Sequence, residues 1–360
     1  MKFELPVYRE PDFTREPMAS SPDAEFRPVE TVGTAPEGYH GTTIFPEYVK
    51  VKGQWRLLKE SRMDCAVVLR DDDELEVVEF RRLKAGDKVL VGREEDGSRG
   101  ILVHVDGFRT SDTIREPFAF RTGRSRETSF SKDYDFLYEL LRYERDHGYI
   151  VWVLGPAVVF DSDSRNGFVS LIEKGYVDAV LAGNAMATHD LEAAIYRTAL
   201  GQDIYSQVPI AKGHYHHIDV INRARKYKSL RDFVEGENID TGIVQACIRK
   251  DIPLVLAGSI RDDGPLPDVI ADAYEAQDRM RDQTRKATTL ICLATQLHTI
   301  ASGNMTPSYI VHEGRVRPVF IFTVDISEFV VNKLQDRGSL SVISIVTNIQ
   351  DFVVHLRNNV

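Results

Sequence analysis

Short apolar runs that end in a small or acidic residue constrain the fold of this chain more than any other feature. Their residues are mostly β-branched, aromatic or leucine, which is typical of parallel strands covered on both faces. Because parallel strands all end at the same edge of a sheet, we expect the residues at their ends to line one crevice. The runs are Ile150–Leu154, Ala179–Ala182, Pro253–Ala257 and Val319–Ile326, and the residues at their ends are Gly155, Gly183, Gly258 and Asp325.

Asp325 is the acidic residue among these strand ends. In dinucleotide-binding folds an acid at such a place usually accepts hydrogen bonds from the ribose hydroxyls of adenosine. Capping of a helix that begins near Ser327 is the alternative role for the same carboxylate. Lys333, about two turns along that helix, could reach a phosphate of the nucleotide or could be a solvated lysine.

Alternating helix and strand patterns from Asp133 onward predict βαβ units and a mostly parallel sheet, so the fold class is α/β. One helix is expected to open at the polar stretch from Thr188 to Glu192. Between 38 and 110 the chain has short alternating runs separated by turn signals, which predicts a small antiparallel sheet or barrel. We therefore expect an N-terminal arm at 1–37, a small β-rich domain with its connector at 38–131, and a larger domain at 132–360.

Composition argues against several classes of protein. The formal net charge of −10 disfavours nucleic acid or an anionic membrane as a partner, because both are bound by clustered Lys and Arg. The three cysteines have no CxxC spacing, which suits a reducing compartment and predicts neither a disulfide framework nor a zinc knuckle. The N-terminal stretch lacks the apolar core of a signal peptide. We expect a cytoplasmic globular protein.

The loops after the strands are the candidate binding elements. The first strand is followed by Gly155-Pro156-Ala157 and not by the GxGxxG fingerprint, so a nucleotide must be held by other loops. Gly183-Asn184-Ala185 offers a tight turn and backbone amides. Thr295, Gln296, Leu297 and His298 form a second junction between a strand and a polar stretch.

The loop from Gly258 to Gly264 carries the densest group of candidate residues. Ser259 can hydrogen-bond a ribose or an amide, and Arg261 can bind the carboxylate of an amino acid. Asp262 and Asp263 supply carboxylates for an ammonium group and for proton transfer. The alternative is a charged loop whose side chains only pair with one another.

Gly213-His214-Tyr215-His216-His217 is a histidine-rich stretch. Adjacent residues seldom ligate one metal ion, and no HExxH or carboxylate spacing accompanies them, so we expect no metal. His214 is a candidate general acid or base, or a candidate phosphate ligand, and an exposed loop at the start of a helix is the alternative.

Six long stretches follow one another in the order seen in a known family. They are TTIFPEYVKVKGQWRLLKESRMDCAVVL (42–69), GYVDAVLAGNAMATHDLEAA (175–194), GHYHHIDVINRAR (213–225), PLVLAGSIRDDGPLPDVIADAYEAQDRMR (253–281), LATQLHTIASGNMTPS (293–308) and VDISEFVVNKLQDRGS (324–339). The chain resembles the ornithine cyclodeaminases of archaea and the carboxy-terminal half of cyanobacterial bifunctional arginine dihydrolases, a group also labelled LOR/SDH proteins.

The resemblance implies a small β-rich module followed by a Rossmann-type domain of the deoxyhypusine-synthase-like kind. It also implies tightly held NAD and a homo-oligomer, either a dimer or a tetramer. By position, the nucleotide contacts would be Asn184, Ala185, Asp263, Thr295, Gln296, Leu297, His298, Asp325 and Ile326. Ser259 is added from its place after a strand, and Lys333 from its place on the helix after Asp325.

The reaction that the resemblance implies is an internal redox cycle. NAD takes a hydride from C2 of L-ornithine, the imine loses ammonia as the δ-amine closes the ring, and the hydride returns to give proline. Two alternatives remain open: an enzyme of the same fold that acts on another amine, and a non-catalytic NAD-binding regulator.

Overall fold

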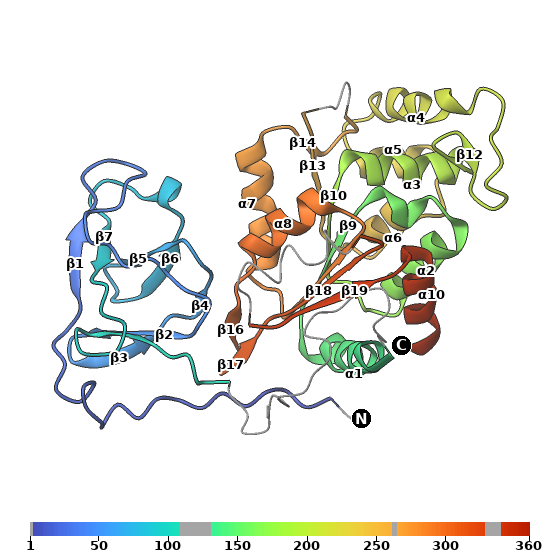
Figure 1. The fold of residues 1–360 in the computed structure, drawn as a ribbon. Helices are drawn as coiled ribbons and strands as arrows, with labels where there is room; N and C mark the ends of the chain where they lie inside the picture. The colour runs from blue at the N-terminus through green and yellow to red at the C-terminus, as the bar shows by residue number, and fades with distance from the viewer. Residues whose placement is uncertain (1–2, 109–130, 261–264, 328–339) are drawn as a thin grey trace.

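The computed structural model describes residues 3–108, 131–260, 265–327 and 340–360. A small β-rich module lies beside a larger α/β domain (Figure 1). The chain enters along the base of both parts, and its C-terminus lies on the larger one (Figure 1). No helix of the described part is long and apolar enough to cross a membrane.

Antiparallel pairs build the small module, as the alternating sequence pattern predicts. One sheet has the order β1-β7-β5-β6 and another the order β3-β2-β8. The side chains of Val49, Val67, Leu90 and Ile101 are fully buried between them. The strands are β1 (Glu25–Pro28), β2 (Glu47–Val51), β3 (Gln54–Leu57), β5 (Ala66–Leu69), β6 (Leu75–Val78), β7 (Lys88–Val91) and β8 (Ile101–Val103).

The first residues of the chain connect the two parts. Phe3 packs its ring against Phe136 and Phe320 of the larger domain, at centroid distances of 5.6 and 5.7 Å. Phe13 stacks on Trp55 of the small module at 5.3 Å. The N-terminal stretch therefore lies across both parts, and its strand β1 pairs with β7.

Seven parallel strands form the sheet of the larger domain, in the order β14-β13-β10-β9-β15-β18-β19. This confirms the α/β class and the mostly parallel sheet. The run that contains Asp325 is a buried strand, as expected. The strands are β9 (Ile150–Leu154), β10 (Ala179–Gly183), β13 (Leu254–Ala257), β14 (Val269–Ile270), β15 (Thr289–Leu293), β18 (Phe320–Asp325) and β19 (Val342–Val346).

Helices cover both faces of the sheet, which is why its strands are apolar without alternation. Trp152 and Leu154 of β9 pack on the face covered by α1, α2, α6 and α10. Val151 and Val153 of the same strand pack on the face covered by α7 and α8. The helices are α1 (Ser131–His147), α2 (Ser162–Glu173), α3 (Asn184–Tyr196), α4 (His216–Ala224), α5 (Leu230–Gly236), α6 (Ile243–Arg249), α7 (Ala273–Thr284), α8 (Gln296–Met305) and α10 (Ile349–Asn359).

The expected helix start at Thr188 to Glu192 is wrong. Helix α3 begins at Asn184, directly after β10, and Gly183 is its N-cap. Thr188 and Glu192 lie inside the helix and are buried. Polar residues that resembled a cap instead point into the protein, where they make hydrogen bonds.

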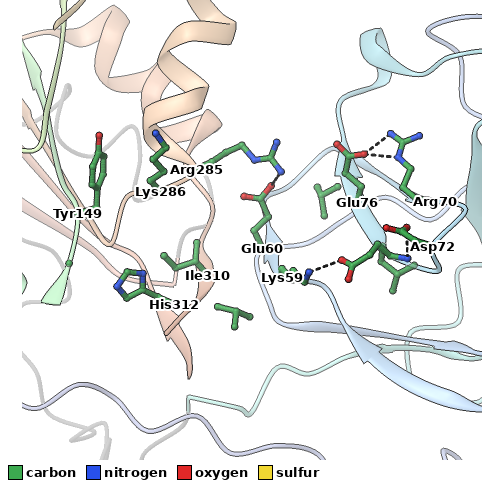
Figure 2. Close-up of a pocket in the computed structure, with 15 residues that line it drawn as sticks. Lys59, Glu60, Arg70, Asp72, Glu76, Tyr149, Arg285, Lys286, Ile310 and His312 are labelled. Atoms are coloured by element: carbon green, nitrogen blue, oxygen red, sulfur yellow. Dashed lines mark hydrogen bonds and ion pairs between the residues drawn. The ribbon is translucent and has the colours of Figure 1, made fainter. Parts of the chain in front are cut away.

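A hairpin of the larger domain joins it to the small module. It consists of β16 (Tyr309–His312) and β17 (Arg315–Pro318), and β16 pairs with β4 (Glu60–Ser61). Tyr309 is fully buried, and its hydroxyl donates to Leu58 O at 3.0 Å. Arg285 of the larger domain meets Glu60 at 2.6 Å across the same boundary (Figure 2). Backbone pairing and an ion pair thus hold the two parts together.

A buried ion pair links the helices that follow β9 and β10. Arg165 of α2 donates from Nε to Asp190 Oδ1 of α3 at 2.7 Å, and both side chains are almost fully buried. The second oxygen of Asp190 accepts from Val244 N at the start of α6, at 2.8 Å. One carboxylate therefore fixes α2, α3 and α6 relative to one another.

We predict that Asp190→Ala destabilises the protein by about 3–5 kcal/mol, because it leaves the Arg165 charge buried without a partner. Urea unfolding followed by circular dichroism measures this change. Glu235→Ala, at an exposed position of α5, is the control and should change stability by no more than about 0.5 kcal/mol. A loss below about 1 kcal/mol for Asp190→Ala would contradict the role assigned to this pair.

Candidate functional site

The strand order reverses between β9 and β15. From β9 the chain proceeds to β10 and β13 on one side, and then from β15 to β18 and β19 on the other. Open α/β sheets bind ligands outside the carboxyl ends of their strands at such a reversal. The candidate residues that the structure describes at strand ends therefore belong to one edge of the sheet.

Gly155 and Ala294 form the backbone at the point of reversal. Gly155 N donates to Leu293 O at 2.8 Å, and a Cβ at position 155 would fall 1.9 Å from Ala294 O. No other residue fits there without moving the backbone. Ala294 itself adopts a left-handed φ of 49°. The two strand ends thus meet through main-chain atoms, which fixes the backbone at the point of reversal.

Asn184 and Ala185 open helix α3 at the end of β10. The Asn184 side chain is buried, and its Oδ1 accepts from Leu266 N at 3.1 Å. This bond fixes Leu266, which precedes β14, against the start of α3. Ala185 is exposed in the first turn of the helix. The N-terminus of a helix favours negative charge through its free amides and dipole, so a phosphate fits at this place.

The residues after β15 form the start of α8, and one of them crosses toward β10. Thr295 is the N-cap, while Gln296 and Leu297 are exposed. The His298 ring covers Gly183, since a Cβ at position 183 would lie 2.9 Å from His298 Cε1. Burial lowers the pKa of His298, which keeps its imidazole neutral near pH 7. A neutral ring can accept or donate one hydrogen bond to a ligand.

Asp325 ends β18 on the other side of the reversal. Its Oδ1 accepts from Ser327 N at 2.9 Å, while the residues that would continue the expected helix, 328–339, lie outside the described part of the chain. The side chain is half-buried, and Ile326 beside it is 60% exposed. A carboxylate can accept several hydrogen bonds, so the bond to Ser327 N is compatible with a second partner.

The remaining strand-end candidates divide into two groups. Ser259 is described, and it is exposed directly after β13. Arg261, Asp262, Asp263 and Lys333 lie outside the described residues, so their assignments stay predictions.

His214 lies on the short 3-10 helix η3 (Gly213–Tyr215), before α4. It is exposed, and its ring lies 4.1 Å from that of Tyr215. Within the described part of the chain, the contacts of His214 include none with the strand-end residues above. Its catalytic role stays a prediction.

A buried network that the sequence did not reveal lies next to His214. Glu192 accepts at Oε1 from Thr198 Oγ1 at 2.9 Å, and its Oε2 lies 2.7 Å from His189 Nδ1. Thr198 Oγ1 also lies 2.7 Å from His216 Nδ1. Burial raises the pKa of Glu192, but the hydrogen bonds from His189 and Thr198 outweigh it and lower the pKa below its usual value. This carboxylate therefore stays charged inside the protein and orients two imidazoles.

A hollow between the two parts of the molecule is lined by many charged side chains, several of which form ion pairs with one another. It has a volume of about 890 Å³ and lies near Tyr149 and Lys286, which precede the amino ends of β9 and β15. Lys59 pairs with Glu74 and Arg70 with Glu76, each at 2.6 Å (Figure 2). Because these charges are used in pairs with one another, we place the candidate site at the opposite edge of the sheet.

Clustered metal ligands are not found where the structure describes the chain: no three His, Cys, Asp or Glu side chains are grouped so as to hold an ion. The chemistry of the edge is instead that of main-chain amides, one carboxylate and a neutral imidazole.

Two family models match the chain. The region at 136–356 matches the Rossmann fold of the C-terminal part of the ArgZ-like arginine dihydrolases, and 46–126 matches the first region of the same C-terminal part. The chain is 36% identical over 345 residues to an ornithine cyclodeaminase of Methanopyrus kandleri, covering 93% of this chain and 77% of that protein. It is 37% identical over 330 residues to the bifunctional arginine dihydrolase/ornithine cyclodeaminase ArgZ of Synechocystis, covering 89% of this chain and 44% of ArgZ.

Solved structures give the same result. A LOR/SDH protein from Methanococcus maripaludis S2 superimposes with a TM-score of 0.85 at 34% identity, over 94% of this chain and 98% of that one. The complex of AgrE with ornithine and NAD⁺ has a TM-score of 0.59 at 34% identity, over 95% of this chain and 46% of AgrE. AgrE of Nostoc is a bifunctional arginine dihydrolase/ornithine cyclodeaminase.

Proposed function

The chain belongs to the family formed by the ornithine cyclodeaminases and the C-terminal region of the ArgZ-like arginine dihydrolases, and we propose that it is an NAD-dependent ornithine cyclodeaminase. L-Ornithine would give proline and ammonia. The observation that carries the proposal is the convergence of Gly155, Asn184, His298 and Asp325 on one edge of a sheet. A related structure holds ornithine and NAD⁺.

The edge fits NAD without the GxGxxG fingerprint. Gly155 lets the ends of β9 and β15 meet at the point of reversal, and the start of α3 at Asn184 and Ala185 suits a phosphate. Asp325 would accept the ribose hydroxyls, and Ser259 and Thr295 to His298 would complete the pocket. NAD supplies a hydride acceptor that returns the same hydride later in the cycle.

The chain's own residues would bind the amino acid and move its protons. We assign Arg261 to the substrate carboxylate, because a guanidinium binds a carboxylate through two parallel hydrogen bonds. Asp262 or His214 would take the proton from the amine as the hydride leaves C2. Asp263 and Lys333 would contact the nucleotide. Arg261, Asp262, Asp263 and Lys333 lie outside the described residues. Their roles rest on the resemblance and on their positions in the sequence.

Incubation of the purified protein with L-ornithine tests the proposal. We expect ammonia and proline in equal amounts, while NADH appears only transiently and at no more than about one equivalent per site, because the cofactor is recycled. Absorbance at the NADH band and product analysis measure both. Steady accumulation of NADH over many turnovers would indicate an ordinary dehydrogenase and contradict the proposal.

The ribose role of Asp325 gives a second prediction. Asp325→Ala should weaken NAD binding about tenfold or more, since a hydrogen bond to a charged group contributes about 1.5–3 kcal/mol. Asp325→Asn separates this role from capping, because its amide oxygen can still accept from Ser327 N. If calorimetry finds that Asp325→Asn binds NAD as tightly as the wild type, the carboxylate acts as a cap and not as a ribose ligand.

Asp262 gives a third prediction. Asp262→Asn keeps the shape of the side chain but removes its charge and its ability to take a proton, so turnover should fall about 100-fold while the Kd for NAD changes little. Steady-state kinetics and calorimetry on one preparation provide both values. Near-normal turnover in the variant would move the proton-transfer role to His214.

We also infer that the protein is a cytoplasmic homo-oligomer. Cys65, Cys247 and Cys292 are buried free thiols, which suits a reducing compartment. Large apolar side chains are exposed together on the segment from the β11–β12 hairpin (Thr198–Ala199 and Gln202–Asp203) to α4. Such a patch on a soluble protein marks a contact surface. Its members are Leu200, Tyr205, Val208, Ile210, Tyr215 and Ile218.

We predict that Ile218→Glu shifts the protein toward the monomer, because it places a charge in an apolar contact. Ile218 is 47% exposed on α4, so the substitution should leave the monomer folded. Light scattering after size exclusion measures the mass. Val105→Glu, at a position 46% exposed on the small module, is the control; equal masses for both variants and the wild type would exclude this surface as the contact.

A further inference from the structure

A cavity of about 300 Å³ lies between the small module and helices α7 and α8. It is separate from the strand-end edge and from the hollow in Figure 2. Arg62, Asp64 and Glu79 line it from the small module, and Arg281 of α7 and Asn304 of α8 line it from the larger domain. Charged side chains thus face the cavity from both sides of the boundary.

Two guanidinium groups of the cavity are buried, and one of them has incomplete hydrogen bonding. Arg62 and Arg281 are 4% and 3% exposed; both pair with Glu79, and Arg281 also donates to Asp278 Oδ1 at 3.2 Å. Arg62 Nη1 has no hydrogen-bond partner in the described structure, and Glu60 Oε1 lies 3.8 Å from it. Burial lowers the pKa of Arg281, and the charges of Arg62, Arg82 and Arg81 lower it further, against the opposite effect of Glu79. An anion in the cavity would relieve the repulsion and would give Arg62 Nη1 a hydrogen-bond acceptor.

Asp64 supplies the opposite charge at the same cavity. Its side chain is exposed, and within the described residues it makes no ion pair. Its backbone has a left-handed φ of 64°, which Asp and Asn tolerate better than most residues. The cavity therefore offers a guanidinium donor that needs an acceptor and a carboxylate that can pair with a cation.

We propose that this cavity is a second binding site, and that its ligand is a free α-amino acid in its zwitterionic form. The carboxylate of the ligand would lie against Arg62 and Arg281, and its ammonium group would pair with Asp64. The carboxamide of Asn304 can hydrogen-bond either group. A ligand held from both sides of the boundary would strengthen the contact between the two parts, so the expected role is regulation by an amino acid.

Asn304 lies far along α8 from the edge at which NAD is proposed to bind. Gln296 begins α8 at the strand-end edge, and Asn304 lies eight residues further along the helix, or about 12 Å at 1.5 Å per residue. Hydride transfer needs reacting atoms about 3–3.5 Å apart. An amino acid at the cavity therefore lies too far from the edge to react there, and the inference goes beyond the proposed function.

Calorimetric titration with L-alanine tests the proposal, because L-alanine has both charged groups but no second amine to cyclise. We expect one L-alanine bound per chain, and binding at least about tenfold weaker for acetate or methylammonium, each of which has only one of the two groups. Asp64→Asn keeps the backbone conformation and should weaken L-alanine binding about tenfold or more. The absence of L-alanine binding to the wild type would overturn the proposal.

Matched variants make the test specific. Asp251→Asn makes the same chemical change at an exposed residue with a φ of 53°, away from the cavity, and should bind L-alanine like the wild type. Asn304→Asp adds a negative charge beside the guanidinium groups and should also weaken binding. Equal affinity of Asp64→Asn and wild type would overturn the site.

The turnover of L-ornithine distinguishes a second site from the reaction site. Asp64→Asn should keep the wild-type kcat at saturating L-ornithine and NAD. A loss of kcat in parallel with the loss of L-alanine affinity would show that the cavity is the reaction site, which would overturn the regulatory proposal. The calorimetric arm needs no turnover, so it gives its answer even if L-ornithine is not the substrate.

Discussion

Burial of the seven-stranded parallel sheet on both faces is the constraint on which the rest of the structure depends. The strands must therefore be mostly apolar, and the polar groups that can meet a ligand lie where a strand ends. Thr323 of β18 and Ser344 of β19, which are polar residues within strands, hydrogen-bond to each other at 3.2 Å. Because all strands of the sheet run the same way, those ends share one edge. Asn184, His298 and Asp325 come together there although they are far apart in the sequence. The location of the candidate site is thus a consequence of the way the sheet is covered.

The parallel sheet and the strand-end position of Asp325 could be predicted because they depend on local patterns. An apolar run of suitable length forms a strand, and the residue that ends it must lie at the edge. The helix start at Thr188 could not be read correctly, because the same polar residues suit a cap and a buried hydrogen-bond network. Only the fold brings Glu192 together with Thr198, and Thr198 with His216.

Contacts between the two parts of the molecule were beyond a reading of the sequence for a different reason. Tyr309 pairs with Ser61 across 248 positions of the chain, and no periodicity in either segment specifies the other. The buried cluster around Glu79 could not be predicted either, because a charged run such as Glu79 to Arg82 has the composition of a solvated turn. Its guanidinium partner Arg281 comes from α7. The cavity beside these charges exists only because these segments meet.

The pairing of β16 with β4 sets an order of events during synthesis. The small module is made first, but β4 has to wait until the hairpin that begins at Tyr309 has left the ribosome. Loop closure over so long a stretch is entropically costly and slow. The early part of the chain must therefore stay soluble with an unpaired strand edge for most of translation. Lys59 and Glu60, which precede Ser61 on that edge, are charged residues of the kind that keep such edges from pairing with other chains.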